Sequence, residues 1–252
     1  MQERDAIVRT LDEYFDVENI SDYGPQGLQV EGAPMVESVL TAVSCSLELF
    51  ERAADKGAQM IVVHHGLIWD RDSRRISGVK RRRLKVLFDN DISLLAYHLP
   101  LDAHPVIGHS ALIAKDLSLV DRKPFASCKN IYLGVQGRLS EGLSASALAE
   151  EVEQICGREA LVLGSEKKKI ETVAIVSGGG ASSLSQAIAE GIDCLISGEA
   201  KEETQALCRE SSTVFIEAGH YNSEKPGILA LGKMMTERFG LEVEFIDLPN
   251  PV

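Results

Sequence analysis

The sequence lacks the features that mark several large classes of protein. Its 5 cysteines are scattered and never form a C-x-x-C pair, which argues against a disulfide framework or a zinc knuckle. No apolar run approaches the roughly 20 residues that cross a bilayer, and the opening MQERDAIVRT has no signal-peptide pattern. Because Asp and Glu number 38 against 26 Lys and Arg, repulsion disfavours nucleic acid or an anionic membrane as a partner. We therefore expect a soluble cytoplasmic protein.

Apolar runs alternate with amphipathic stretches almost from end to end of the sequence. With 252 residues, 44% of them hydrophobic, the chain can form one large or two small domains. Strands separated by helices predict an α/β fold with mostly parallel sheets flanked by helices. The stretch DRKPFASCKN interrupts this pattern, so we predict one lobe over 1–125 and a second over 126–252. The last helix and strand fit either lobe.

Residue spacing assigns the individual elements. The predicted helices cover 3–15, 46–56, 80–90, 110–117, 146–156, 182–190, 201–210 and 224–239. The predicted strands cover 28–30, 38–44, 60–63, 92–97, 131–135, 161–163, 172–176, 194–196, 214–217 and 242–246.

Three polar clusters each follow one of these apolar strands. MIVVHHG contains the pair His64 and His65. LLAYHLPLDAH contains His98, Asp102 and His104, and VFIEAGHYNSE contains His220 and Glu224. In open α/β sheets, ligands bind beyond the carboxyl ends of the strands. We therefore expect the clusters to meet at such ends, between the two lobes.

Each of these residues also has an ordinary structural reading. A histidine beside a buried strand is commonly a satisfied loop residue, Asp102 fits a turn, and Glu224 fits the first turn of a helix. Together, however, the two carboxylates and four imidazoles, with His104 not counted, exceed the three protein ligands of a usual catalytic zinc. The set predicts two divalent ions, Zn, Fe or Mn, about 3.5–4 Å apart, with Glu224 as the candidate bridge.

Further motifs suit a substrate pocket around that site. The backbone of Gly178, Gly179 and Gly180 in SGGGASS either cradles an anion or makes a tight turn. Glu199 in SGEAK either assists proton transfer or is a helix-start acid. The basic segment 71–85, RDSRRISGVKRRRLK, is typical of a solvated loop and helix face, and the alternative is steering of nucleotide phosphates.

The motifs VHHG, YHLPLDAHP, SGGGA, SGE, GHYNSE and FIDLPNPV occur in this order along nearly the whole chain. Together they resemble the GTP cyclohydrolase I type 2 homologs, a family of Nif-like dinuclear-metal-centre proteins, in a short form without the mid-chain insert. The resemblance implies a two-lobed α/β fold and a toroidal homohexamer with paired metals facing an internal cavity. It implies ligands at the matching positions: His64, His65, Asp102, His220, Glu224 and, as a sixth, His98.

The sequence departs from this family at two places. His109 in HPVIGHSA stands where an asparagine is expected, and we leave it outside the ligand set, with the roles of His109 and His104 open. The segment SDYGPQGLQV replaces a version that contains tryptophan, which puts contacts from that loop in doubt.

The family name implies an activity, the opening of the GTP imidazole ring by water to give a formylated product. In this interpretation Glu199 moves protons, and the glycine turn with Arg and Lys side chains holds the phosphates of a nucleotide. Two alternatives stay open. One is a metal-dependent hydrolase acting on another small molecule or a phosphoester, and the other is a non-enzymatic metal-binding or scaffold ring.

Overall fold

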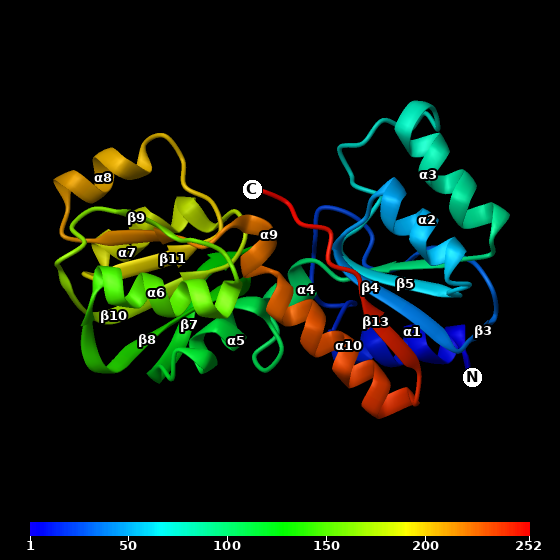
Figure 1. The fold of residues 1–252 in the computed structure, drawn as a ribbon, viewed down its shortest axis with the longest axis horizontal. Coiled ribbons are helices and arrows are strands. Elements are labelled where there is room, and N and C mark those ends of the chain that lie inside the picture. Colours follow the sequence, from blue (N-terminus) through cyan, green and yellow to red (C-terminus); the bar gives the residue numbers. More distant parts are fainter. The chain divides into compact units, whose positions relative to one another are not determined.

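The structure, a computed structural model, describes residues 1–252 and divides into two compact units. Unit 1 comprises Met1–Leu101 and Ile228–Leu248, and unit 2 comprises Asp102–Gly227 and Pro249–Val252 (Figure 1). Each unit combines a β-sheet with helices, which confirms the predicted α/β class. No helix is both long and apolar enough to span a bilayer.

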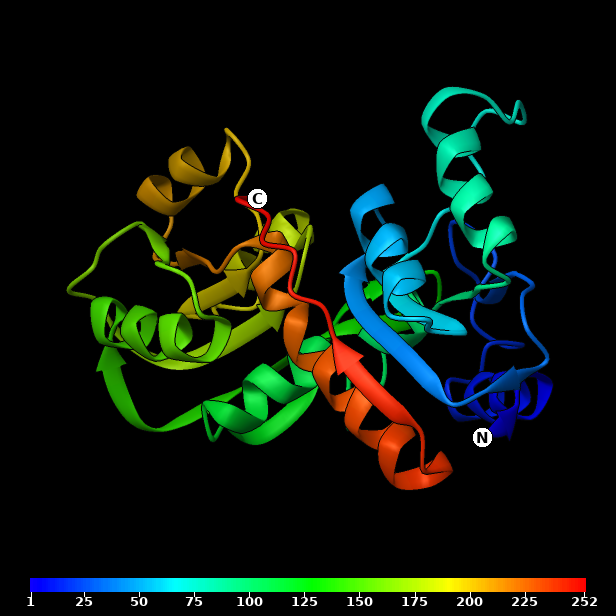
Figure 2. The ribbon, with the colours of Figure 1, turned by 45° about the vertical axis from the view of Figure 1, so that its right-hand side comes forward.

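Unit 1 is built on a five-stranded sheet in the order β13-β4-β5-β6-β2. Its strands are β2 (Gly27–Val30), β4 (Ser38–Ser44), β5 (Met60–His65), β6 (Ser93–Ala96) and β13 (Glu242–Phe245). All neighbours pair in parallel except β2, which is antiparallel to β6. Strand β13, from the far end of the chain, lies beside β4 (Figure 2). The predicted parallel sheet is therefore present in this unit.

Helices cover both faces of that sheet. On one face, α2 (Leu47–Asp55) and α3 (Gly78–Asp89) share a buried cluster with side chains of β4, β5 and β6. On the other, α10 (Lys225–Phe239) brings Gly232 against Thr41 and Val243. The remaining elements are helix α1 (Arg4–Tyr14) and the short β1 (Gln2–Glu3) and β3 (Met35–Val36). A sheet covered on both faces requires strands without polar alternation, as in MIVV and SLLA.

Unit 2 is built on a six-stranded mixed sheet in the order β7-β8-β10-β11-β12-β9. Its strands are β7 (Val120–Cys128), β8 (Ile131–Ser144), β9 (Leu161–Leu163), β10 (Lys169–Val176), β11 (Cys194–Ser197) and β12 (Val214–Glu217). Only β10, β11 and β12 are parallel, so the expectation of mostly parallel sheets is corrected to a mixed sheet here.

The helices of unit 2 include the crossovers between its parallel strands. They are α5 (His109–Asp116), α6 (Ala145–Cys156), the 3-10 turn η1 (Gly180–Ser183), α7 (Leu184–Ala189), α8 (Thr204–Glu210) and α9 (His220–Ser223). The short α4 (Leu99–Asp102) stands where the chain passes from unit 1 to unit 2.

The division between the units differs from the predicted boundary near residue 125. The stretch DRKPFASCKN forms the edge strand β7 and the turn to β8, in which Lys129 and Asn130 have φ of 47° and 67°. Hairpin turns and linkers use the same polar turn residues, so the composition could not separate them. The division instead falls at Leu101, and 228–248 belongs with the first unit.

Candidate metal centre

Three imidazoles meet at the carboxyl edge of the sheet in unit 1. Strands β5 and β6 are parallel neighbours with Val63 opposite Ala96, so the residues that follow emerge side by side. The ligating atoms of His64, His65 and His98 lie within 4.8 Å of one another. We call these three residues the histidine cluster. Although successive strand residues normally point to opposite faces, the rings of His64 and His65 have centroids only 4.6 Å apart.

A protein oxygen engages the Nδ1 atom of each ring in the histidine cluster. The distances are 3.0 Å from His64 to the Tyr97 carbonyl, 2.9 Å from His65 to Ser44 Oγ, and 2.8 Å from His98 to Asp22 Oδ1. A carbonyl oxygen only accepts, so neutral His64 carries its proton on Nδ1 and its lone pair on Nε2. This arrangement is typical of histidines that bind metals through Nε2.

Asp22 is the charged partner of the histidine cluster. Its side chain is 1% exposed, and its second oxygen accepts the Leu99 N–H at 2.7 Å. Burial alone would raise the pKa of this carboxyl, but the hydrogen bond from His98 and the N–H groups of Tyr23 and Leu99 bring the pKa below its usual range. An ionised Asp22 therefore fixes the orientation of His98.

Sequence reasoning missed most of the residues that support the histidine cluster. Gln26 Oε1 accepts the N–H of His98, and Gln29 Oε1 accepts the N–H groups of Leu67 and Ile68. Trp69 packs edge-on against His98 with centroids 5.1 Å apart. The only available signal was the concentration of polar acceptors in the turn-rich SDYGPQGLQV, which the structure places against the histidine loops.

A second cluster lies at the carboxyl edge of the parallel strands in unit 2. Gly178 follows β10, Glu199 follows β11 and His220 follows β12. His220 Nδ1 pairs with Glu199 Oε1, and its Nε2 lies 3.1 Å from Oε1 of Glu224, which is 3% exposed. We call Glu199, His220 and Glu224 the acidic cluster.

The acidic cluster concentrates negative charge around one imidazole. Burial alone would lower the pKa of His220, but hydrogen bonds and charge from Glu224 and Glu199 raise this pKa to about 9. Two carboxylates at one imidazole therefore favour a positive charge among them, which a divalent cation also supplies.

The glycine loop packs directly on the acidic cluster. Gly178 has φ of 59°, and a Cβ there would collide with Glu224 Oε1 and lie 3.1 Å from His220 Nε2. Its N–H donates to Ser223 Oγ, and the N–H of Gly180 donates to the Gly178 carbonyl. Both N–H groups are thus already engaged by oxygens of the protein. Substrate binding by Gly178, Gly179 and Gly180 stays a prediction.

Asp102 ends α4 and lies near the fully buried His109 in unit 2. His109 Nδ1 accepts the N–H of Gly227 at 3.1 Å, and its Nε2 is 4.0 Å from Asp102 Oδ1. Neutral His109 therefore carries its proton on Nε2 and presents a donor rather than a lone pair to Asp102. The exclusion of His109 from the ligand set stays a prediction.

His104 has a local structural role in the turn that precedes α5. Its Nδ1 accepts the N–H groups of Val106 and Ile107, each at 3.2 Å. Burial lowers the pKa of His104, which favours the neutral acceptor form.

The donor atoms in both units are imidazole nitrogens and carboxylate oxygens. This chemistry suits Zn²⁺, Fe²⁺ or Mn²⁺ and needs no thiolate. The residues of each unit therefore fit a divalent metal ion by donor type, with oriented imidazoles in unit 1 and negative charge in unit 2.

The chain matches known proteins along nearly its whole length. The model of the family described as Duf34/NIF3 (NGG1p interacting factor 3) matches residues 2–251. The chain is 39% identical over 246 residues to the GTP cyclohydrolase 1 type 2 homolog of Pseudomonas aeruginosa, covering 98% of this chain and 97% of that protein. It is 40% identical over 246 residues to the protein of the same name from Pasteurella multocida, covering 97% and 98%.

Solved structures share the fold. Protein ybgI, described as of unknown function, superposes with a TM-score of 0.92 at 37% identity and 100% coverage of both chains. TTHA1606 from Thermus thermophilus gives a TM-score of 0.89 at 33% identity, again with 100% coverage of both.

Proposed function

The chain belongs to the Duf34/NIF3 family, and we propose that it is a hydrolase dependent on two divalent metal ions. The histidine cluster is the observation that carries the proposal, because each of its three rings has Nδ1 engaged by a protein oxygen. The proposed ligands are those predicted from the sequence: His64, His65 and His98 in unit 1, and Asp102, His220 and Glu224 in unit 2.

Proposed ligands of the two units lie close together along the chain. The chain passes between the units after Leu101, Gly227 and Leu248, and proposed ligands adjoin the first two passages. His98 and Asp102 are four residues apart in the sequence, so their Cα atoms are separated by no more than about 14 Å. Glu224 precedes the second passage by three residues. Its buried carboxylate would help to hold the divalent ions.

A bound divalent ion acts as a Lewis acid and lowers the pKa of a coordinated water towards ~7. The side chains of this protein have separate tasks. Ser44, Asp22 and the Tyr97 carbonyl hold the imidazoles in the ligating orientation. Glu199 accepts the Nδ1 proton of His220, and its side chain is 40% exposed, so it can exchange protons with solvent. Glu199 is therefore proposed as a positioning residue that also moves protons.

The finer proposal concerns substrate and assembly. The relatives are named GTP cyclohydrolase 1 type 2 homolog, which supports GTP as the first substrate to test, with opening of its imidazole ring. A toroidal homohexamer of the 27.4-kDa chain, located in the cytoplasm, completes the proposal. Light scattering on the purified protein would report a particle of six chains.

The test combines metal analysis with turnover. Protein purified without added metal should contain about two equivalents of Zn, Fe or Mn, and the loaded protein should convert GTP to a ring-opened product. Asp102→Ala should lose both metal and turnover, whereas Asp55→Ala, an exposed aspartate in α2, should keep both. If the metal-loaded protein hydrolyses a phosphoester but does not convert GTP, the hydrolase proposal stands and GTP is rejected as its substrate. Full metal content without turnover of any compound would favour the scaffold alternative and overturn the hydrolase.

A further inference from the structure

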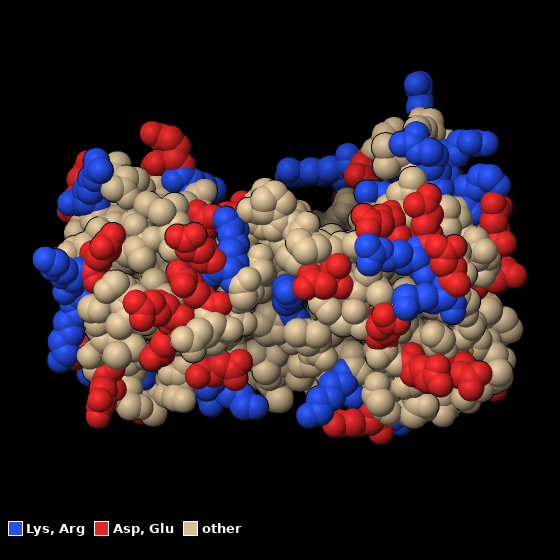
Figure 3. Space-filling view, viewed as in Figure 1, with Lys and Arg blue, Asp and Glu red and all other residues tan.

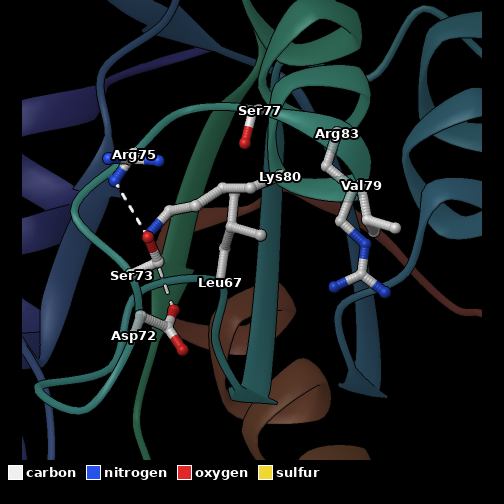
Figure 4. Close-up of a pocket in the computed structure, with 8 residues that line it drawn as sticks. All are labelled: Leu67, Asp72, Ser73, Arg75, Ser77, Val79, Lys80 and Arg83. Carbon is white, nitrogen blue, oxygen red and sulfur yellow. Dashed lines mark hydrogen bonds and ion pairs between the residues drawn. The ribbon is translucent and has the colours of Figure 1, made fainter.

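A basic cavity lies in unit 1, beside the start of α3. It has a volume of about 320 Å³ and is formed by the loop after β5 together with the first turns of α3 (Figure 4). Its polar lining consists of Asp72, Ser73, Arg75, Ser77, Lys80 and Arg83. Leu67 and Val79 supply an apolar wall. The cavity therefore combines charged donors with a small surface for carbon atoms.

The charges in this cavity are not balanced. Three cationic side chains face one carboxylate, and the only ion pair among them joins Lys80 Nζ to Asp72 Oδ2 at 3.5 Å. Arg75 and Arg83 have no carboxylate partner, and the Nε atom of Arg83 is buried without a hydrogen-bond acceptor. The lining thus carries a net charge of about +2, although the whole chain has a formal net charge of −12.

The surroundings strengthen the positive potential. Lys and Arg side chains gather over α3 in the space-filling view (Figure 3), and the segment 71–85 adds Arg71, Arg74, Arg81 and Arg82 to the lining residues, whereas its Lys85 pairs with Asp89. Such a concentration of one sign raises the local density of anions at the cavity mouth.

The start of α3 contributes backbone donors as well. The N-cap residue Ser77 makes no side-chain capping bond, and the first turn of this 12-residue helix has no acidic residue. The first N–H groups of a helix have no partner within the helix and favour an anion. Here an anion in the cavity would complement both these N–H groups and the Ser77 hydroxyl.

We propose that the basic cavity binds the dianionic phosphate group of a small phosphate monoester. The charge of −2 matches the lining, guanidinium groups form paired hydrogen bonds to phosphate oxygens, and Leu67 and Val79 contact the carbon part. A volume near the lower end for small-molecule sites suits a compact ligand. The proposal goes beyond the metal centre and does not depend on it, although Leu67 follows the proposed ligand His65 by two residues.

Calorimetry on the metal-loaded protein tests this site with inorganic phosphate, ribose 5-phosphate and ribose. Saturable binding of one ribose 5-phosphate per chain is expected, weaker binding of inorganic phosphate and none of ribose. Arg75→Gln and Arg83→Gln should each weaken binding about tenfold or more, because each removes charged hydrogen bonds. The matched control is Arg82→Gln, since Arg82 is exposed on the same helix and does not line the cavity.

Chelated protein separates this site from the metal centre. Unchanged binding after metal removal, with the same response to the arginine variants, supports the basic cavity. The proposal would be overturned if ribose 5-phosphate binding is lost on metal removal but is unchanged in Arg75→Gln and Arg83→Gln. Equal losses for all three arginine variants, or tighter binding of a single-stranded oligonucleotide than of ribose 5-phosphate, would assign the basic segment to a diffuse polyanion surface. Circular dichroism of each variant verifies that α3 is retained.

Discussion

The histidine cluster of unit 1 and the acidic cluster of unit 2 are built on different physical terms. In unit 1, neighbouring oxygens hold three imidazoles by Nδ1, so the rings are oriented before any ion binds. In unit 2, two carboxylates surround one imidazole whose pKa is raised to about 9. Unit 1 thus contributes imidazoles in fixed orientations, and unit 2 contributes the negative charge of its carboxylates.

The largest effect is expected from removing charge in unit 2. Glu224→Gln keeps the size of the side chain but removes a buried carboxylate, so we expect metal affinity to fall more than a hundredfold, measured by competition with a chelator. Glu202→Gln, an exposed glutamate of the same unit, is the control. Equal metal affinity in Glu224→Gln and wild type would show that the buried carboxylate of unit 2 does not contribute to metal binding.

A glycine substitution tests how closely the loop after β10 approaches the acidic cluster. Gly178→Ala and Gly191→Ala both place alanine at positive φ, 59° and 69°, but only Gly178 has neighbours within 4 Å. Both variants should lose roughly 1 kcal/mol of unfolding free energy from backbone strain. Only Gly178→Ala should also lose metal, by displacing Glu224. Similar metal content in the two variants would show that the close approach of Gly178 to Glu224 does not affect metal binding.

A smaller effect is expected from disturbing orientation in unit 1. Asp22→Asn removes the charged partner of His98 without removing a ligand, and such changes typically cost about 10–100-fold in metal affinity. Asp55→Asn serves as the exposed control. Chelator competition measures the affinity, and an unchanged value for Asp22→Asn would mean that the histidine cluster needs no fixed orientation.

A carboxylate outside both clusters should affect stability without affecting metal. Asp193 lies 2.9 Å from Lys168 and accepts N–H groups of Glu171 and Thr172. Burial raises its pKa, but these partners bring the pKa below the usual value of 3.8. Its stabilisation is therefore present above pH 3.8 and is lost as the pH falls through the lower folded-state value.

Asp193→Asn should lower the unfolding free energy by roughly 1–3 kcal/mol at pH 7. In this variant the unfolding free energy should also decrease less steeply as the pH falls. Denaturant titrations between pH 3 and pH 7 measure this, with Glu202→Gln again as the control. A loss of metal in Asp193→Asn would contradict the distinction between structural and site carboxylates.

The sequence was sufficient to locate most elements and the candidate ligands. Apolar runs such as 60–63 and 214–217 fall in β5 and β12, and the polar residues after them lie at carboxyl edges within their own units. The resemblance read from VHHG and GHYNSE is confirmed as family membership. Such features are local in sequence, so periodicity and motif order reveal them.

Other features depend on contacts between distant segments. Asp22 approaches His98, and Ser44 approaches His65, only because β2, β4, β5 and β6 pair as they do. The antiparallel β7 and the division at Leu101 likewise follow from pairing and packing, which turn-rich composition does not specify. Ligand candidates were thus readable, whereas the residues that orient them were not.

The proposed function requires two divalent ions with ligands in both clusters. Anomalous diffraction at the metal edge, from crystals of the metal-loaded protein, tests it directly. We expect two peaks per chain within coordination distance of the histidine cluster and of Asp102, His220 and Glu224. Absence of peaks there, or a single ion held by only one of the two clusters, would contradict it.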